Sequence, residues 1–267
     1  MSFRVGFIGA GNIAKAILTG SLNSGYIKPK NIYIYDIAEE KLDIFATYGV
    51  GVCKTANSVM NHCDIIFLTV KPQCYGEVIE SVKEDMSADK CIVDVGAGVT
   101  IDFVRRAFGF DCKVVRVMPN TPIMYSNGTA GIVRSSLVSD DEFYFVKGFF
   151  DSNGISCVVE EDLIDVVTGV SGSAPAFVFR FAKGIISAGI DRGLSPETAE
   201  KLAINTIIGS AQMIEKSPLS ITELIKMVAS PNGTTEAGLK FLDNSGFDNS
   251  VYGAVSAAID RAVELKQ

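Results

Sequence analysis

The sequence Gly9-Ala10-Gly11-Asn12-Ile13-Ala14 decides the fold class of this chain. It directly follows the apolar run Val5-Gly6-Phe7-Ile8 and directly precedes residues that repeat apolar side chains at helical spacing. A strand, a tight turn and a helix are therefore expected in that order. In such a unit Gly9 allows a sharp turn, Gly11 lets a pyrophosphate approach the backbone, and Ala14 lets the helix pack closely on the strand. Free N–H groups at the start of the helix would face the phosphates.

The residues that follow this turn favour a dinucleotide site over an ordinary tight turn. The pattern G-x-G-x-x-A by itself is weak, because any α/β protein can contain it. Here a second extended run, Asn31-Ile32-Tyr33-Ile34-Tyr35, ends in Asp36. An acid in this place along the chain is expected to bind the ribose of the cofactor. Strand, turn, helix, strand and acid in this order predict dinucleotide binding.

Composition limits the classes of partner. The chain has 267 residues, 48% of them hydrophobic, and a formal net charge of −7. This is enough for a sizeable core in one large or two modest domains. The negative charge without clustered Lys or Arg argues against nucleic acid. The absence of a long apolar run and of a signal peptide predicts a soluble, cytoplasmic protein with no membrane partner.

The cysteines and the histidine predict neither thiol nor metal chemistry. The six cysteines are scattered without a C-x-x-C pair, and His62 is the single histidine. Scattered cysteines of this kind are typical of reduced, structural thiols. We therefore expect no metal site.

The chain is expected to be α/β, with two domains. Residues 1–160 alternate buried β-rich runs with helical segments, which predicts a Rossmann-type dinucleotide-binding domain with a mainly parallel sheet. Ligands of such a sheet gather outside the carboxyl ends of its strands. Residues 161–267 lack β-branched runs and are expected to form an all-helical domain for substrate binding and dimerisation.

Capping patterns and apolar content organise the expected helical domain. Ser173 is placed to cap a helix with Pro175 in its first turn, Ser195-Pro196 starts another helix, and Ser220-Ile221-Thr222-Glu223 has the capping-box pattern. The helix expected over Glu197 to Ile214 is apolar on more than one side. In a small domain the simplest cover is a second subunit, so we expect an obligate homodimer.

Two turns of small residues in this second region could hold a substrate. The segment from Ser230 to Thr235 carries Pro, Gly and hydroxyl side chains just before a helix, which suits a carboxylate. An ordinary joint between helices with a Thr cap explains the same pattern about equally well. The turn Ser171-Gly172-Ser173-Ala174-Pro175 presents a similar choice.

The whole chain resembles the pyrroline-5-carboxylate reductase family. The matching motifs are Phe7-Ile8-Gly9-Ala10-Gly11-Asn12, Val70-Lys71-Pro72, Met118-Pro119-Asn120-Thr121-Pro122, the run from Asp165 to Ala176, and Val228-Ala229-Ser230-Pro231-Asn232-Gly233-Thr234-Thr235. The last motif is far more specific than the nucleotide turn. The resemblance implies an NAD(P)H-dependent oxidoreductase that reduces 1-pyrroline-5-carboxylate to L-proline, the last step of proline biosynthesis. It also implies a homodimer that can build larger rings, such as a decamer of dimers.

The resemblance further implies roles for individual residues. The catalytic candidates are Thr235, for hydrogen bonding to the imine nitrogen, and Glu161 nearby. The substrate would be held by Ser171, Ser173, Ser230, Asn232, Gly233, Thr234 and Thr235. The cofactor, NADPH or NADH, would be held by Gly9, Ala10, Gly11, Asn12, Ile13, Asp36, Asn57, Val70, Lys71, Pro72, Ala97 and Asn120.

The chain departs from the family pattern at two positions. Asn232 stands where a first glycine is common. Asp36 stands where members often carry small polar or basic residues that tolerate a 2′-phosphate. Because a carboxylate accepts hydrogen bonds from a ribose diol and repels a phosphate, we expect NADH to be used at least as well as NADPH.

Two other functions stay open at this point. One is another reductase of the same architecture, such as an imine reductase or a β-hydroxyacid dehydrogenase. The latter is expected to carry a catalytic Lys on the helix after Ser171-Gly172-Ser173, whereas Lys183 lies further along. The other is a nicotinamide-binding sensor without turnover, against which the intact turn from Ser230 to Thr235 argues.

Overall fold

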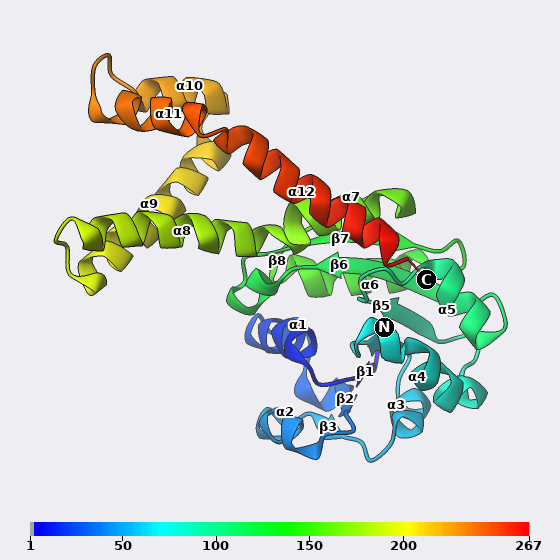
Figure 1. Ribbon diagram of the computed structural model, residues 1–267. Helices are drawn as coiled ribbons and strands as arrows, with labels where there is room; N and C mark the ends of the chain where they lie inside the picture. The colour runs from blue at the N-terminus through cyan, green and yellow to red at the C-terminus, as the bar shows by residue number, and fades with distance from the viewer. Residues whose placement is uncertain (1–2, 267) are drawn as a thin grey trace. The chain divides into compact units, whose positions relative to one another are not determined.

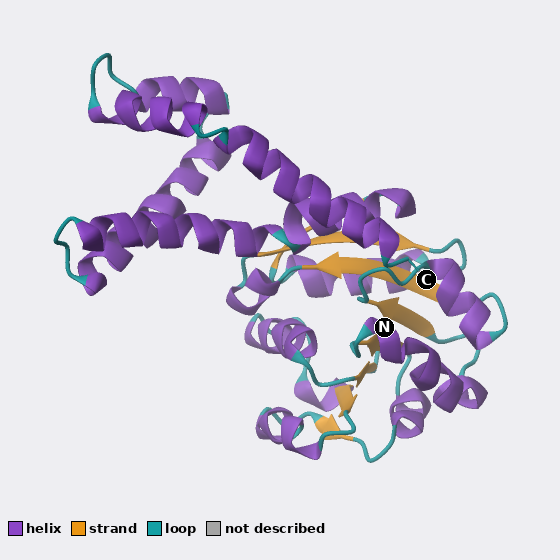
Figure 2. Cartoon of the chain, viewed as in Figure 1, coloured by secondary structure: helices purple, strands orange, loops and turns teal. Residues whose placement is uncertain are grey.

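The computed structural model describes residues 3–266 of the chain. Within them the chain forms two compact units, one of residues 3–173 with 257–266 and one of residues 174–256 (Figure 1). The first unit contains every strand of the described residues, and the second is helical (Figure 2).

The first unit alternates strands and helices from its start. Its elements are β1 Val5–Ile8, α1 Asn12–Asn23, β2 Ile32–Tyr35, α2 Asp43–Thr47, β3 Gly51–Val52, α3 Ala56–His62, β4 Ile65–Leu68, α4 Tyr75–Val82, β5 Cys91–Asp94, α5 Ile101–Phe108, β6 Lys113–Pro119, β7 Gly128–Arg134, α6 Asp140–Asp151, β8 Gly154–Val158 and α7 Ile164–Val167.

The strands of the described residues form one eight-stranded sheet in the order β3-β2-β1-β4-β5-β6-β7-β8. Val5 of β1 pairs in parallel with Ile32 of β2 on one side and with Ile65 of β4 on the other. The β6 to β7 pair is antiparallel and the remaining pairs are parallel. This confirms the expected mainly parallel sheet, and its order reverses beside β1, where the glycine turn begins.

The core lies on both faces of the sheet because successive strand residues point to opposite sides. On one face, Phe67 of β4 packs with α1 and α6 through side chains such as Ile17 and Phe149. On the other face, Leu68 packs with α3, α4 and α5 through side chains such as Val59. The phenyl rings of Phe7 and Phe67 stack with centroids 4.6 Å apart. Coverage on both faces explains why the central strands read as continuous apolar runs.

Local capping explains where several helices begin and end. Thr55 Oγ1 accepts the N–H of Ser58 at the start of α3, and Thr100 Oγ1 accepts the N–H of Phe103 at the start of α5. Helix α5 ends at Gly109, whose φ of 84° suits glycine. Ser139 and Glu142 form a capping box at the start of α6.

The second unit contains α8 Ala174–Asp191, α9 Pro196–Lys216, α10 Ile221–Val228, α11 Thr234–Asn244 and most of α12 Phe247–Glu264. The expected caps are confirmed: Ser195 Oγ accepts the N–H of Thr198, and Ser220 forms a capping box with Glu223. Helices α8 and α9 contact each other, and the rings of Phe181 and Phe247 lie 6.2 Å apart.

Much apolar surface of the second unit is open. In the described residues, both hydrophobic core clusters consist of residues up to Ile164, so neither includes this unit. Phe179 is 65% exposed, Leu202 57% and Phe241 71%. A free unit with so little buried apolar side chain lacks the main driving force for folding.

One helical stretch differs from the expectation that no run reaches the length of a membrane span. By length and composition, Glu161–Asp191 is long and apolar enough to cross a membrane, and 17% of its most apolar window is buried. One such helix is weak evidence, because helices of soluble proteins pass the same criterion. Its first part includes the buried Asp165, whose carboxylate binds a lysine of the same unit.

Candidate functional site

The turn between β1 and α1 requires glycine at its first position. Gly9 has a φ of 109°, and a Cβ built there would lie 2.7 Å from the carbonyl carbon of Thr69. The Thr69 hydroxyl closes this approach by donating to the Gly9 carbonyl at 2.7 Å. Glycine is therefore needed for both conformation and space.

Gly11 serves a different purpose in the same turn. A Cβ built at Gly11 would have nothing within 4 Å, so the space beside this backbone is open. Gly11 is also the N-cap of α1, and no side chain of the described residues caps that helix. The first N–H groups of α1 are left for a ligand, and they carry the partial positive charge of a helix start. This arrangement fits a pyrophosphate.

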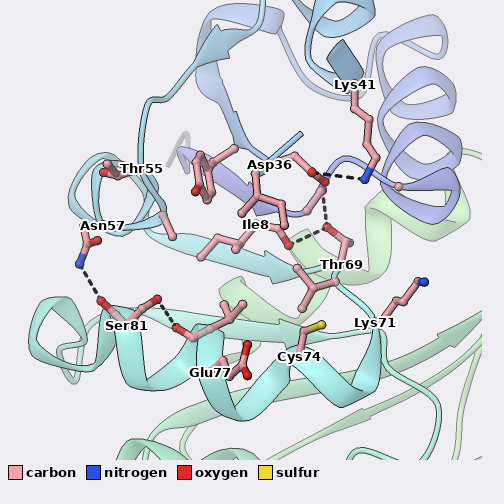
Figure 3. A pocket seen from close by; sticks show the side chains of 17 residues that line it. Ile8, Asp36, Lys41, Thr55, Asn57, Thr69, Lys71, Cys74, Glu77 and Ser81 are labelled. Atoms are coloured by element: carbon pink, nitrogen blue, oxygen red, sulfur yellow. Dashed lines mark hydrogen bonds and ion pairs between the residues drawn. The ribbon is translucent and has the colours of Figure 1, made fainter. Parts of the chain in front are cut away.

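A cavity of about 670 Å³ opens at this turn. This volume is in the range of small-molecule and cofactor sites. The residues that line it come from the ends of β1, β2 and β4 and from the facing parts of α3 and α4 (Figure 3). They are Ile8, Gly9, Gly11, Tyr35, Asp36, Ile37, Lys41, Thr55, Ala56, Asn57, Thr69, Val70, Lys71, Cys74, Glu77, Val78 and Ser81.

Asp36 is held rigidly at the wall of this cavity. Its Oδ2 accepts the N–H of Ala10 at 2.7 Å, and its Oδ1 accepts the N–H of Ala38 at 2.9 Å. The ammonium of Lys41 lies 3.3 Å from the same Oδ1 (Figure 3). Burial pushes the pKa of Asp36 upward, but these three donors outweigh it and hold that pKa below its usual value. The carboxylate is therefore charged at neutral pH.

Other residues expected at the cofactor lie at the strand ends around the cavity. Asn57 lines it, and its amide donates to the Ser81 carbonyl at 2.9 Å and to Asp85 at 2.6 Å. Val70 and Lys71 line it directly after β4. Ala10, Asn12, Ile13, Pro72, Ala97 and Asn120 are not among its lining residues. Ala97 follows β5 and Asn120 follows β6, so both lie at carboxyl ends of strands.

Asn120 connects three parts of the first unit. It is buried, its Oδ1 accepts the N–H of Thr129 at 2.9 Å, and its Nδ2 donates to the Ser171 carbonyl at 3.2 Å. Pro175 has no N–H for that carbonyl, which stands four residues before it. The Asn120 amide supplies the missing donor.

The same proline corrects the expectation that Ser173 caps a new helix. The structure has a π-helical segment, η7 Thr168–Gly172, between α7 and α8, and the Ser173 N–H donates to the Thr168 carbonyl at 2.8 Å. Ser173 has helical dihedral angles, so it lies inside a continuous helical path. A π segment accommodates the proline with one residue more per turn, and such segments are frequent at functional sites.

The sequence reasoning missed a buried group of charges beside the expected site. Arg116 is 1% exposed, and its guanidinium lies 3.3 Å from Glu161 Oε1 and 3.7 Å from Asp165 Oδ1. The Lys266 ammonium lies 2.7 Å from Asp165 Oδ2. Asp94 pairs in register with Arg116 across β5 and β6. A charged residue inside each of the apolar runs Cys91-Ile92-Val93-Asp94-Val95 and Lys113-Val114-Val115-Arg116-Val117 was the signal available in the sequence.

Asp94 is a fully buried carboxyl group of this cluster. Burial raises its pKa to about 7, although the Gly96 N–H, Tyr75 and Arg116 act in the opposite direction. The Gly96 N–H donates to Asp94 Oδ1 at 2.8 Å, and Oδ2 has no hydrogen-bond partner. A proton therefore exchanges at this carboxyl group near neutral pH.

Glu161 ties the same cluster to helix α5. Its Oε1 accepts the N–H of Ile101 at 2.8 Å, while the Arg116 guanidinium approaches the same oxygen. The loop between β5 and α5, which contains Ala97, leads directly into Ile101. Glu161 thus fixes the end of that loop.

In the second unit, Ser230 to Gly233 form the turn before α11, and Thr234 and Thr235 are the first two residues of that helix. Asn232 adopts a left-handed φ of 58°, which asparagine tolerates better than other residues with a side chain. The Asn232 N–H donates to Glu236 Oε2 at 2.5 Å, and the Gly233 N–H donates to the Ser230 carbonyl at 3.0 Å. Gly233 is the N-cap of α11 and has no side-chain cap. The N–H groups of Thr234, Thr235 and Glu236 are therefore the first of the helix and lack a side-chain cap.

The described residues contain no group of three or more His, Cys, Asp or Glu side chains placed to hold a metal ion. The six cysteines are free, and burial raises the pKa of the Cys91 thiol well above its usual value. A buried thiol such as that of Cys91 is a poor nucleophile.

Two family models match the chain. The model described as pyrroline-5-carboxylate reductase dimerisation matches residues 161–265, and the model described as NADP oxidoreductase coenzyme F420-dependent matches residues 4–98. Among curated proteins, the chain is 34% identical to pyrroline-5-carboxylate reductase 2 of Bacillus subtilis, over 99% of this chain and 95% of that protein. It is also 34% identical to pyrroline-5-carboxylate reductase of Escherichia coli, over the full length of both.

Solved structures agree with the sequence relatives. Pyrroline carboxylate reductase of Plasmodium falciparum with NADP bound superimposes with a TM-score of 0.93 at 30% identity, covering 99% of this chain and 98% of that chain. The pyrroline-5-carboxylate reductase of Coxiella burnetii gives a TM-score of 0.91 at 31% identity, covering both chains fully. A ketol-acid reductoisomerase at 12% identity and a TM-score of 0.66 shares the fold alone.

Proposed function

The chain belongs to the pyrroline-5-carboxylate reductase family, and from this premise we propose its activity. It reduces 1-pyrroline-5-carboxylate to L-proline with a reduced nicotinamide cofactor, as the last step of proline biosynthesis. It is thus an NAD(P)H-dependent oxidoreductase that acts on a cyclic imine. The observation that carries this conclusion is similarity to such reductases over the whole chain.

The first unit supplies a fitting site for the cofactor. The open backbone at Gly11 and the uncapped start of α1 suit a pyrophosphate, and the fixed Asp36 carboxylate suits a ribose diol. We propose that the cofactor is held by Gly9, Ala10, Gly11, Asn12, Ile13, Asp36, Asn57, Val70, Lys71, Pro72, Ala97 and Asn120. Most of these residues follow the carboxyl ends of β1, β2, β4, β5 and β6, and Asn12, Ile13 and Asn57 lie in the first turns of α1 and α3, which supports this assignment.

The reaction needs little acid–base machinery from the protein. When bound, the reduced nicotinamide supplies the hydride that the imine carbon receives. The ring nitrogen takes one proton, so the C=N bond becomes CH–NH. The protein's own tasks are to orient the imine, exclude water and hold a proton donor near the nitrogen. A site without histidine or reactive cysteine is compatible with these tasks.

We propose that the turn before α11 holds the substrate carboxylate. The N–H groups of Thr234 and Thr235 support this role, because they lie at an uncapped helix start. Asn232 and Gly233 shape the turn, since their own N–H groups are bound within it. The hydroxyl of Thr235, which is half-buried, is proposed to hydrogen-bond the imine nitrogen. Ser171, Ser173 and Ser230 complete the proposed substrate set.

For Glu161, the contacts support a positioning role in catalysis. Its carboxylate is bound by the Ile101 N–H and the Arg116 guanidinium. Both donors approach the same oxygen, Oε1, so they fix the orientation of the carboxylate. We propose that Glu161 acts by fixing the loop that carries Ala97.

We propose that the helical region makes the protein a homodimer. The match to a dimerisation family model over residues 161–265 supports this, as do the exposed side chains of Phe179, Leu202 and Phe241. In this dimer a second copy covers these side chains and the apolar stretch Glu161–Asp191. A membrane is then not needed to cover that stretch. Larger assemblies, such as a decamer of dimers, are an extension of the same proposal. Sedimentation that finds a stable, active monomer at micromolar concentration contradicts it.

We propose that the protein has no nucleic-acid partner, and its net charge of −7 supports this, because the phosphate backbone is also negative. A biosynthetic reductase that uses a soluble cofactor and a soluble imine is proposed to work in the cytoplasm, apart from membranes. Fractionation of cells should recover the activity in the soluble fraction.

The proposed reaction is tested with purified protein, 1-pyrroline-5-carboxylate and either NADH or NADPH. We expect cofactor oxidation that matches proline formation. A β-hydroxyacid with NAD or NADP, offered in parallel, should give no reduction of the cofactor. Turnover of the hydroxyacid without turnover of the imine would assign the chain to another reaction.

A further inference from the structure

We propose that Asp36 makes this reductase select NADH over NADPH, and that Lys41 limits the strength of that selection. The inference rests on the proposed function, since it assumes that the cavity at the glycine turn takes the adenosine end of the cofactor. It goes beyond that function because it assigns the cofactor preference to two residues of this chain.

The first step is that the Asp36 carboxylate cannot leave the cavity wall easily. Two backbone N–H groups hold it, from Ala10 in the glycine turn and from Ala38 just after the strand. These donors belong to the backbone, so rotation of the Asp36 side chain would break two hydrogen bonds at once. A 2′-phosphate that enters here meets a fixed negative charge.

The second step concerns the hydrogen bonds that the carboxylate can still accept. Oδ1 already accepts hydrogen bonds from the Ala38 N–H and the Lys41 ammonium. Among the described residues, Oδ2 accepts one from the Ala10 N–H alone. A carboxylate oxygen accepts about two hydrogen bonds. Oδ2 therefore has capacity for a ribose hydroxyl, which donates a proton. A phosphate dianion has no proton to donate and is repelled.

The third step is the charge of the segment that follows Asp36. Its sequence is Asp36-Ile37-Ala38-Glu39-Glu40-Lys41. Ile37 is 88% exposed and lines the cavity, so it offers an adenine an apolar surface and offers a phosphate no donor. Glu39 and Glu40 add negative charge. Lys41 is the single cation of the segment, and it is already paired with Asp36.

Lys41 accordingly favours NADPH in two ways. While paired, it reduces the repulsion between Asp36 and an incoming phosphate. It lies in the first helical turn after the strand, from which its flexible side chain can also reach a 2′-phosphate. The other cation that lines the cavity, Lys71, comes from the end of β4 on a different strand. Removal of Lys41 should therefore disfavour NADPH more than NADH.

The test measures binding, apart from turnover. Calorimetry of the full-length protein compares 5′-AMP with 2′,5′-ADP, and NAD with NADP. For the wild-type protein we expect NAD to bind at least about tenfold more tightly than NADP, because the fixed carboxylate of Asp36 repels the 2′-phosphate. Asp36→Ser should remove or reverse this ratio by freeing Lys41 for the phosphate. Lys41→Ala should increase the ratio.

The control variant is Glu197→Gln, which removes the carboxylate of an exposed pair with Lys201 on α9. It changes the net charge by the same amount as Asp36→Ser does. If the ratio of NAD to NADP affinity is unchanged in Glu197→Gln, the effect of Asp36→Ser on that ratio is local. The proposal is overturned if the wild-type protein binds 2′,5′-ADP more tightly than 5′-AMP, or if Lys41→Ala leaves the ratio unchanged. Both results can be measured even if the Asp36→Ser variant does not fold, because neither uses that variant. Failure of every nucleotide to bind would instead overturn the proposed function.

Discussion

Replacement of Asp94 by asparagine should stabilise the protein at neutral and alkaline pH. Burial raises the pKa of this carboxyl group to about 7 from an ordinary value of 3.8. At about 1.4 kcal/mol per pH unit, that difference corresponds to roughly 4 kcal/mol for the fully ionised group. Asparagine has nearly the same shape, and its side-chain oxygen can still accept the Gly96 N–H. It should therefore avoid the cost of burying a charge.

The sign of the pH dependence follows from proton binding. Between pH 3.8 and about 7, the native state keeps a proton on Asp94 that the unfolded chain has lost. The stability contributed by this group is fully present below pH 3.8 and is lost as pH rises through about 7. Asp94→Asn should therefore match the wild type near pH 4 and exceed it by up to roughly 4 kcal/mol near pH 8.

Denaturant unfolding at one protein concentration and several pH values measures this difference. The control is Asp151→Asn. Burial pushes the pKa of Asp151 upward, but hydrogen bonds from Lys147 and Ser156 outweigh it and keep that pKa below 3.8. The stability that Asp151 contributes is lost only as pH falls through that low pKa. Asp151→Asn should therefore change the free energy of unfolding by the same amount at pH 6 and pH 8. Parallel curves for wild type and Asp94→Asn over pH 5 to 8 would refute the reasoning.

Substitutions at three further positions test the two proposed binding elements. Gly9→Ala places a Cβ on backbone with a positive φ, 2.7 Å from the carbonyl carbon of Thr69. It should lower the free energy of unfolding by about 1–3 kcal/mol and weaken cofactor binding. An unchanged melting temperature and cofactor affinity would show that the turn relaxes. Thr235→Ala should lower kcat about tenfold, because one transition-state hydrogen bond is lost. Cofactor affinity should be unchanged, and Thr235→Ser should restore kcat. A wild-type kcat for Thr235→Ala at neutral pH would place the proton donor elsewhere. Asn232→Gly should preserve activity, whereas Asn232→Val should raise KM because a β-branched residue strains a φ of 58°; equal KM values would contradict this.

The sequence predicted strands β1 to β6 well because their signals are local. The glycine turn, Asp36 and the apolar runs through β6 are each readable within a few residues. Strand β7 was missed, since its sequence Gly128-Thr-Ala-Gly-Ile-Val-Arg134 begins with small residues and pairs antiparallel to β6. Strand β8 was missed because it is a largely exposed edge strand whose short apolar sequence is interrupted by Ser156.

The rest of the site depends on contacts between distant residues. The π-helical segment forms where Pro175 leaves the Ser171 carbonyl without a helical donor and Asn120 supplies one. The group formed by Arg116, Glu161 and Asp165 joins β6 to the start of the helical region. No spacing rule along the chain gives these pairs, because folding brings them together.

The central claim, hydride transfer to a cyclic imine, is tested most directly by isotope transfer. NADH deuterated at the transferable position of the nicotinamide is mixed with 1-pyrroline-5-carboxylate and the purified protein, and the proline formed is analysed by mass spectrometry and NMR. The account predicts one deuterium per proline, at the carbon that was doubly bonded to nitrogen. Proline without deuterium at that carbon, or no proline from correctly folded protein with either cofactor, would contradict it.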